Sequence, residues 1–269
     1  MPHRRLSHES RFLLLLALTV SASAQTSSDP RISLFNYNEE PTRIRFTLRN
    51  NHNAPITFYQ VRLQSQCPDG RAVDAGGWSL DTLRTRAGEP DLQEFSSIQV
   101  ETIEPGETHQ FEFVRPGEVS TTTVNAHGSE THMCQPATLK DFTVIFMDGT
   151  GIGVPELIEK QFVNWQRERN EVTRWLAPLH ELRIARNVSV ATQSLRDRLN
   201  EAYDDCEDRT LTDQKIAECQ MNREVWHQVN RVWQQLRSAP TNGIETIARL
   251  INYWDRVADL LEKQSSRRN

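Results

Sequence analysis

Apolar and polar residues alternate through the first half of the chain, which is the pattern of half-buried β-strands. The clearest cases are residues 44–48 and 56–63, which are separated by turn-forming residues at 50–55. Further strands are expected at 98–102, 109–114, 120–125 and 142–147. Several short strands, with Pro-Gly turns and without helical patterns between them, predict an antiparallel β-sandwich over residues 30–150.

One stretch of this half, residues 68–93, shows no regular alternation. It contains Gly76-Gly77 and Gly88, and glycines weaken a strand and favour loops. The sequence therefore predicts a long irregular excursion here, with at most one short strand or one turn of helix.

The spacing of apolar residues changes near Asp148-Gly149 from every second residue to alternating steps of three and four, which is a helical period. Pro155 suits the first position of a helix. Pro178 lies inside the same run and is expected to kink or interrupt it. The change of period predicts that the strands end here and that an α-helical bundle occupies residues 155–266.

The bundle is expected to have three or four helices. A weaker amphipathic segment covers residues 190–203, and strong ones cover 219–236 and 244–261. The breaker between the last two, at 238–243, is short, so they should form an antiparallel hairpin with coiled-coil-like packing. We interpret most of the tryptophans of this half as core or interface residues: Trp165, Trp175, Trp226, Trp233 and Trp254.

The first 24 residues have the features of a secretory signal peptide. Basic residues at 3–5 precede the apolar run at 12–18, and Ala22-Ser23-Ala24 matches the small-residue pattern before a cleavage site. The apolar run is too short for a mature membrane span. The sequence therefore predicts a secreted or periplasmic protein that begins near Gln25 and has no transmembrane segment in its mature form.

The composition limits the partners of such a protein. The signal peptide carries three arginines and one glutamate, so 28 basic and 35 acidic side chains remain, a net charge of about −7. An acidic chain argues against nucleic acid or an anionic membrane surface as partner. The expected partner is a protein or a cell-envelope component, and the helical region is a candidate surface for homo-oligomers.

The four cysteines are the strongest chemical signal in the sequence. An even number in an exported chain suggests two disulfides, and four cysteines allow three pairings. We favour Cys67 with Cys134 and Cys206 with Cys219, because each pair then stays within one half of the chain. The alternative is that either pair remains as free buried thiols.

A metal site is conceivable at His127, Glu130, His132 and Cys134, but structural zinc sites prefer tighter paired spacings, so we expect no metal. Polar side chains on a loop are the favoured interpretation. A cysteine that forms a disulfide is also lost as a ligand.

Two glycine-containing motifs suggest chemistry that the rest of the sequence does not support. The run 149–153 lacks the last glycine of a dinucleotide-binding loop, and no βαβ unit surrounds it, so it is interpreted as a flexible joint. The run 77–81 has Asp81 where a nucleophile elbow needs glycine. The acidic residues of the first helix are interpreted as solvent-exposed surface charges: Glu156, Glu159, Glu168 and Glu171.

Three short stretches of the first half are similar to stretches of a known class of β-sandwich proteins. They are the turn ending in Ala54-Pro55-Ile56-Thr57, the segment 103–107 before a strand, and 144–150, which ends in Asp-Gly-Thr. Together they resemble the immunoglobulin-like or fibronectin-type sandwiches of secreted bacterial proteins of uncharacterised function. The resemblance covers residues 30–153. It implies a fold followed by a helical tail, and it carries over no catalytic or cofactor-binding residue.

Two classes of function remain from the sequence. The favoured one is an exported, non-catalytic binding or structural protein, since no catalytic constellation is visible and sandwiches often serve recognition. The alternative is an exported hydrolase whose site lies on a loop, in the excursion 68–93 or at 127–134. A convergent set of His, Ser and carboxylate groups would distinguish the second class.

Overall fold

The structure is a computed structural model that describes residues 29–40, 42–87, 102–114, 120–125, 128–204 and 212–266. Its strands are β1 (Ile32–Glu39), β2 (Arg43–Asn50), β3 (Ile56–Gln66), β4 (Ala72–Asp81), β5 (Thr108–Val114), β6 (Ser120–Asn125), β7 (Gly128–Met133), β8 (Thr138–Phe146) and β9 (Gly151–Ile152). Its helices are α1 (Leu83–Ala87), α2 (Pro155–Ile184), α3 (Val188–Asp204), α4 (Asp213–Ser238) and α5 (Pro240–Ser266). The signal peptide and most of the strand expected at 98–102 lie outside the described residues.

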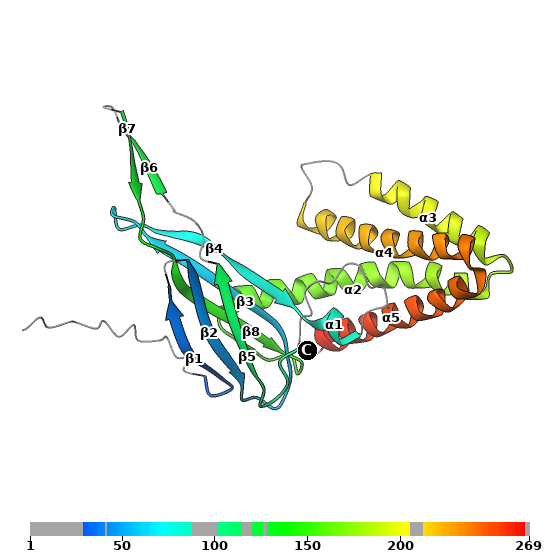
Figure 1. Cartoon of the computed structure of the whole chain (residues 1–269), viewed down its shortest axis with the longest axis horizontal. Helices are drawn as coiled ribbons and strands as arrows, with labels where there is room; N and C mark the ends of the chain where they lie inside the picture. Colours follow the sequence, from blue (N-terminus) through cyan, green and yellow to red (C-terminus); the bar gives the residue numbers. More distant parts are fainter. Residues whose placement is uncertain are drawn as a thin grey trace, which may run out of the picture.

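Two antiparallel sheets pack face to face. One has the order β1-β2-β5 and the other has the order β4-β3-β8-β9 (Figure 1). Ile44, Phe46 and Leu48 alternate along β2 and are at most 1% exposed. They share one apolar core with Val61 of β3 and Val144 of β8. The alternation predicted these strands because one face of each is buried, and those expected at 44–48, 56–63, 109–114, 120–125 and 142–147 are confirmed.

The prediction of an irregular excursion at 68–93 is wrong for its described part. Residues 72–81 form β4, which pairs with β3 over its whole length, and α1 follows it. Gly76 and Gly77 pair with Leu63 and Arg62, and a register shift between Leu63 and Gln64 leaves the next residue, Ala75, without a paired residue. A Cβ atom at Gly77 would lie 2.1 Å from the carbonyl oxygen of Val61, so this glycine permits close strand pairing. The same glycines that suggest a loop are therefore part of a strand.

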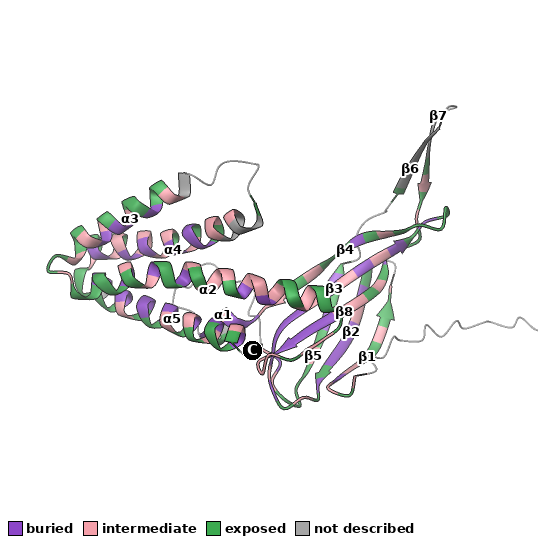
Figure 2. Cartoon of the chain, turned by 180° about the vertical axis from the view of Figure 1, so that it is seen from behind, coloured by how far each residue is buried: buried purple, intermediate pink, exposed green. Residues whose placement is uncertain are grey.

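Four long helices, α2 to α5, follow the strands and pack lengthwise with alternating direction (Figure 1). Figure 2 shows that their buried residues lie on the sides that face one another. Pro155 occupies the first turn of α2, as predicted. Pro178 was expected to kink or interrupt the helix, and it does not interrupt it, since α2 continues to Ile184. Trp175 and Leu179 are buried on either side of the proline, and this packing holds the helix together.

The predicted antiparallel hairpin is formed by α4 and α5, which are separated only by Ala239. The Thr212 hydroxyl accepts a hydrogen bond from the backbone N–H of Lys215 and caps the start of α4. Trp165, Trp175 and Trp254 are at most 3% exposed, so these three tryptophans are core residues as expected.

The helices and the second sheet share a further apolar core. Phe58 of β3 and Ile145 of β8 point away from the first sheet and pack with residues of the helices, including Trp165 of α2. The ring centroids of Phe58 and Trp165 are 6.4 Å apart. At the end of α5, the buried amide of Gln264 donates to the Thr57 hydroxyl at 3.3 Å and to the Phe146 carbonyl at 3.4 Å. Apolar and polar contacts therefore both join the strands to the bundle.

The glycine-containing run 149–153 is a packed turn, which differs from the flexible joint that the sequence suggested. Its residues Gly151 and Ile152 form β9 and pair with β8. Gly153 has φ +113°, and a Cβ atom there would lie 2.5 Å from the Phe142 carbonyl oxygen. The glycines therefore serve a close approach of the chain to β8, and α2 starts from a fixed position.

Candidate functional site

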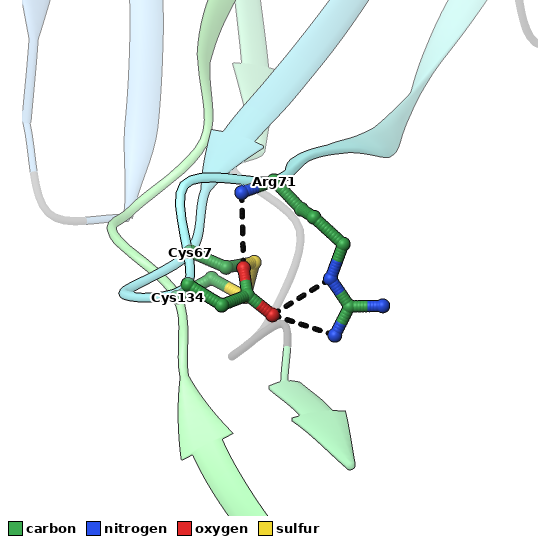
Figure 3. The surroundings of a disulfide bond; sticks show 4 residues. Cys67, Arg71 and Cys134 are labelled. Atoms are coloured by element: carbon green, nitrogen blue, oxygen red, sulfur yellow. Dashed lines mark hydrogen bonds and ion pairs between the residues drawn. A yellow bond between two sulfur atoms is a disulfide. The ribbon is translucent and has the colours of Figure 1, made fainter. Parts of the chain in front are cut away.

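The most prominent feature outside the two cores is a disulfide-anchored hairpin. Cys67 follows β3 and Cys134 follows β7, and their sulfur atoms are 2.00 Å apart, which confirms the pairing predicted from the sequence (Figure 3). The bond joins two positions 67 residues apart in the chain. The backbone N–H of Gln135 also donates to the carbonyl of Gln66 at 2.7 Å. The disulfide and this hydrogen bond together fix the base of the hairpin to the second sheet.

The turn around Cys67 is itself well ordered by hydrogen bonds. The N–H of Gly70 donates to the Cys67 carbonyl, and the N–H of Cys67 donates to the Arg71 carbonyl, each at 2.9 Å. Asp69 accepts from the backbone N–H of Arg71 at 2.9 Å and from its guanidinium at 2.7 Å (Figure 3). This hydrogen-bonded ion pair holds the pKa of Asp69 below its ordinary value. Cys67 thus lies in a turn that positions it for the bond.

The hairpin consists of β6 and β7, and in the described part of the chain these strands pair only with one another. It extends away from both sheets and from the bundle (Figure 1). The sequence predicted β6 but not β7, because Gly128–Met133 (GSETHM) shows no apolar alternation. A two-stranded ribbon without a core contributes little to the stability of a fold.

Only one cysteine of the second predicted disulfide lies in the described part of the chain. Cys219 of α4 is disulfide-bonded, while Cys206, its expected partner, lies outside the described residues. The pairing of Cys206 with Cys219 stays a prediction.

A half-buried polar cluster lies between the strands and the helices, and Asp81 is its centre. Asp81 ends β4, and its carboxylate accepts hydrogen bonds from Gln161 at 2.9 Å and from the Trp165 indole, both in α2. The other oxygen accepts from the backbone N–H of Leu83 at 3.0 Å and caps α1. Burial, with a smaller contribution from the charge of Glu168, raises the pKa of Asp81 to about 6.

Arg84 of α1 adds a second contact with α2 and extends the cluster to α4 and α5. Its guanidinium donates to Glu168 of α2 at 2.7 Å and pairs with Glu224 of α4. It also lies over the ring of Trp254 in α5, 5.9 Å from the centroid. Glu168 was expected to be a solvent-exposed surface charge. This expectation is wrong, because the Glu168 side chain is only 20% exposed and forms an ion pair with Arg84 of α1.

Two histidine–carboxylate pairs are present among the described residues. Nε2 of His52 lies 2.5 Å from Asp148, and Nε2 of His180 lies 2.9 Å from Asp255. Burial tends to raise the pKa of Asp148, but hydrogen bonds from Thr150 and His52 outweigh it, and the pKa is lowered. In the part of the chain that the structure describes, no Ser or Cys side chain hydrogen-bonds to either histidine. Neither pair therefore forms the nucleophile–base arrangement of a hydrolase.

The other sequence candidates are not assembled into a site. His127 lies outside the described residues, and the Cys134 sulfur is in the disulfide. No group of three His, Cys, Asp or Glu residues that could hold a metal ion occurs among the described residues. Ser79 and Asp81 of the run 77–81 lie in β4 and pair with Gln60 and Phe58 of β3, so no nucleophile elbow is formed there.

The helices in the described part of the chain all lack the apolar stretch that a bilayer crossing requires. Comparison of the chain with protein-family models, with curated proteins and with solved structures gives no match. The interpretation of the protein therefore rests on its own residues.

Proposed function

We propose that the protein is an exported, non-catalytic binding or structural protein that recognises another protein or a cell-surface component. We further propose that the β6–β7 hairpin makes this contact. The immunoglobulin-like character of the sandwich and the division into two domains, residues 30–150 and 155–266, belong to the same proposal.

The hairpin is the observation that carries this proposal. It extends from the sheets, pairs with no other strand in the described residues, and is held at its base by the Cys67–Cys134 disulfide. A covalent anchor at the base of a projecting ribbon fixes the position of the ribbon relative to the sheet, in addition to restricting the unfolded chain. Both edges of such a ribbon offer backbone groups to a partner strand.

The polar clusters support the non-catalytic part of the proposal. Asp81 has a raised pKa, which is common in active sites. Its hydrogen bonds, however, run to Leu83, Gln161 and Trp165, which connect β4 to α1 and α2. The His52–Asp148 pair likewise connects two turns of the sandwich.

The test compares three forms of the exported protein in affinity capture from its own cell envelope. The first is the wild type, the second has residues 120–133 replaced by a short Gly-Ser linker, and the third is Cys67→Ala/Cys134→Ala. We expect the linker form to lose a partner that the wild type captures, and the cysteine variant to capture it more weakly. Circular dichroism and thermal unfolding monitor the fold of each form.

Equal capture by the wild type and the linker form would show that the β6–β7 hairpin does not make the contact with the partner. A protein that captures nothing and instead hydrolyses an ester, peptide or glycan would favour the hydrolase alternative.

A further inference from the structure

The end of the helical bundle that lies away from the sheets combines unpaired positive charge with exposed aliphatic side chains. At this end α2 and α4 finish and α3 and α5 begin (Figure 1). We define the distal end as residues 180–198 and 228–250. From these residues we infer a surface that docks on an anionic phospholipid membrane.

The first observation is the segregation of charge. The distal end carries seven arginines, no lysine and three acidic residues, a net charge of +4 in a chain whose net charge is −5. The net charge of the whole chain is negative, which by itself argues against an anionic partner, but the net charge of the distal end is positive. A local field of one sign attracts a surface of the opposite sign over about one Debye length, ~8 Å at physiological salt.

The second observation is that several of these arginines lack carboxylate partners. Arg183, Arg186 and Arg237 are exposed, and they form no ion pair within the described residues. Some exposed arginines elsewhere in the described chain are paired, as Arg43 is with Glu112 and Arg86 is with Glu104. The charge of the distal end is consequently available to a partner.

The third observation is the position of Trp233. Two guanidinium groups lie over its ring in α4: Arg196 of α3 is 4.1 Å and Arg237 of α4 is 4.9 Å from the centroid. Stacking on an indole orients a guanidinium without using its N–H donors. The donors of Arg237 in particular remain free to bind phosphate oxygens.

The fourth observation distinguishes a membrane from other anionic partners. Three of the most exposed large aliphatic residues in the described chain lie at the distal end: Ile184 (83% exposed), Val190 (62%) and Ile244 (56%). They come from α2, α3 and α5, around the end of the bundle. An acidic polysaccharide would leave these side chains in water, whereas the boundary between lipid headgroups and acyl chains accepts aliphatic and arginine side chains together.

The experiment measures binding of the exported protein, which begins near Gln25, to lipid vesicles at 0.1 M NaCl. One set of vesicles contains equal amounts of phosphatidylglycerol and phosphatidylcholine, and the other contains phosphatidylcholine alone. We expect the protein to sediment with the anionic vesicles and not with the neutral ones. Arg183→Gln/Arg186→Gln/Arg237→Gln should lower the partition coefficient by about 100-fold, since each arginine near an anionic surface is worth a factor of about 5.

A matched control carries the same loss of charge elsewhere. Arg49→Gln/Arg223→Gln/Arg256→Gln changes three exposed arginines of β2, α4 and α5 outside the distal end, and we expect its binding to stay within about threefold of the wild type, an effect of long-range charge alone. Equal losses in the two triple variants would overturn the proposal, because binding would then follow total charge.

A second variant tests the aliphatic contribution. Ile184→Ser/Val190→Ser/Ile244→Ser keeps every charge and changes only exposed side chains, so its thermal unfolding should match the wild type. We expect its binding to anionic vesicles to fall by at least tenfold. Undiminished binding of this variant would show that the aliphatic side chains do not enter the membrane and would overturn the proposal. Retention of the wild type on heparin without binding to vesicles would identify an acidic polymer as the partner.

Discussion

The indole N–H of Trp165, in the third turn of α2, donates a hydrogen bond to the carboxylate of Asp81 at the end of β4. The two residues are 84 positions apart, and each comes from a different half of the chain. Asp81 also accepts from Gln161, one turn earlier on the same helix. A half-buried carboxylate of the strands thus fixes the orientation of the first long helix, and its charge makes the contact sensitive to pH.

Asp81 should make the stability of the protein depend on pH between about 4 and 7. Its pKa is about 6 in the folded protein and near 3.8 when unfolded, so the folded state binds a proton that the unfolded state has released. The free energy of unfolding should therefore rise as the pH falls, by about 2 kcal/mol between pH 7.5 and pH 4.5 from this group. Urea unfolding of the wild type and Asp81→Asn across this range gives the measurement.

The asparagine variant removes the titration of this carboxyl. It also replaces one of the two acceptor oxygens by an NH2 group, a loss of hydrogen bonding that does not depend on pH. The stability difference between the two proteins should change by that amount over the pH range. A difference that stays constant from pH 7.5 to pH 4.5 would show that Asp81 titrates normally.

Arg84 should contribute more to stability than an arginine with similar partners in the bundle. Arg84→Met leaves Glu168 and Glu224, which are 20% and 30% exposed, without their cation, and we expect a loss of about 2 kcal/mol. Arg174 is the matched control, because it also pairs with two glutamates, each 21% exposed, and also lies over a tryptophan ring. It differs in its own exposure, 50% against 36% for Arg84, and in joining only two helices of the bundle. Arg174→Met should cost less than about 1 kcal/mol.

Urea unfolding at neutral pH compares the two variants. Equal losses would mean that the position between strands and helices gives Arg84 no special role.

The Cys67–Cys134 disulfide should stabilise the strand half by restricting the unfolded chain. For a bond that closes a loop of this length, the chain-entropy model gives about 4 kcal/mol. Cys67→Ala/Cys134→Ala should therefore lower the midpoint of urea unfolding without changing the far-ultraviolet circular dichroism at low denaturant. The substitutions are preferable to a reductant, which would also act on the disulfide of Cys219.

Peptide mapping under non-reducing conditions provides the control for this variant. Cys206 should be recovered linked to Cys219 in both proteins. Recovery of Cys219 linked to any other chain position would contradict the predicted pairing.

Gly153 should be intolerant of any side chain. Its φ of +113° and the short distance from a Cβ atom to the Phe142 carbonyl mean that Gly153→Ala strains the backbone where β9 leads into α2. We expect a loss of about 3 kcal/mol. Gly106→Asn is the control, since Gly106 also has positive φ, +81°, but has open space around it, and asparagine tolerates that conformation.

Thermal unfolding of both variants tests this expectation. A loss at Gly106→Asn as large as at Gly153→Ala would attribute the effect to backbone conformation alone and not to the contact with β8.

The sequence by itself was sufficient for most of the elements and for one disulfide. Strands such as β2 and β3 bury alternate residues, and helices such as α4 and α5 bury residues at steps of three and four. The spacing of apolar residues along the sequence therefore predicts the type of each element. Cys67 and Cys134 were paired correctly because each lies in the strand half. The signal peptide, the immunoglobulin-like family and the binding function remain predictions.

The tertiary structure decided where residues distant in the sequence meet. β4 was missed because Gly76 and Gly77 interrupt its alternation, and only its pairing with β3 makes it a strand. The contacts of Asp81 with Trp165 and of Arg84 with Glu168 have no local signal, since each joins residues 84 positions apart. The arginines of the distal end are likewise scattered along four helices, and only the antiparallel packing of those helices brings them together. Local periodicity reports how deeply a residue is buried, whereas the choice of its partner depends on packing of the whole chain.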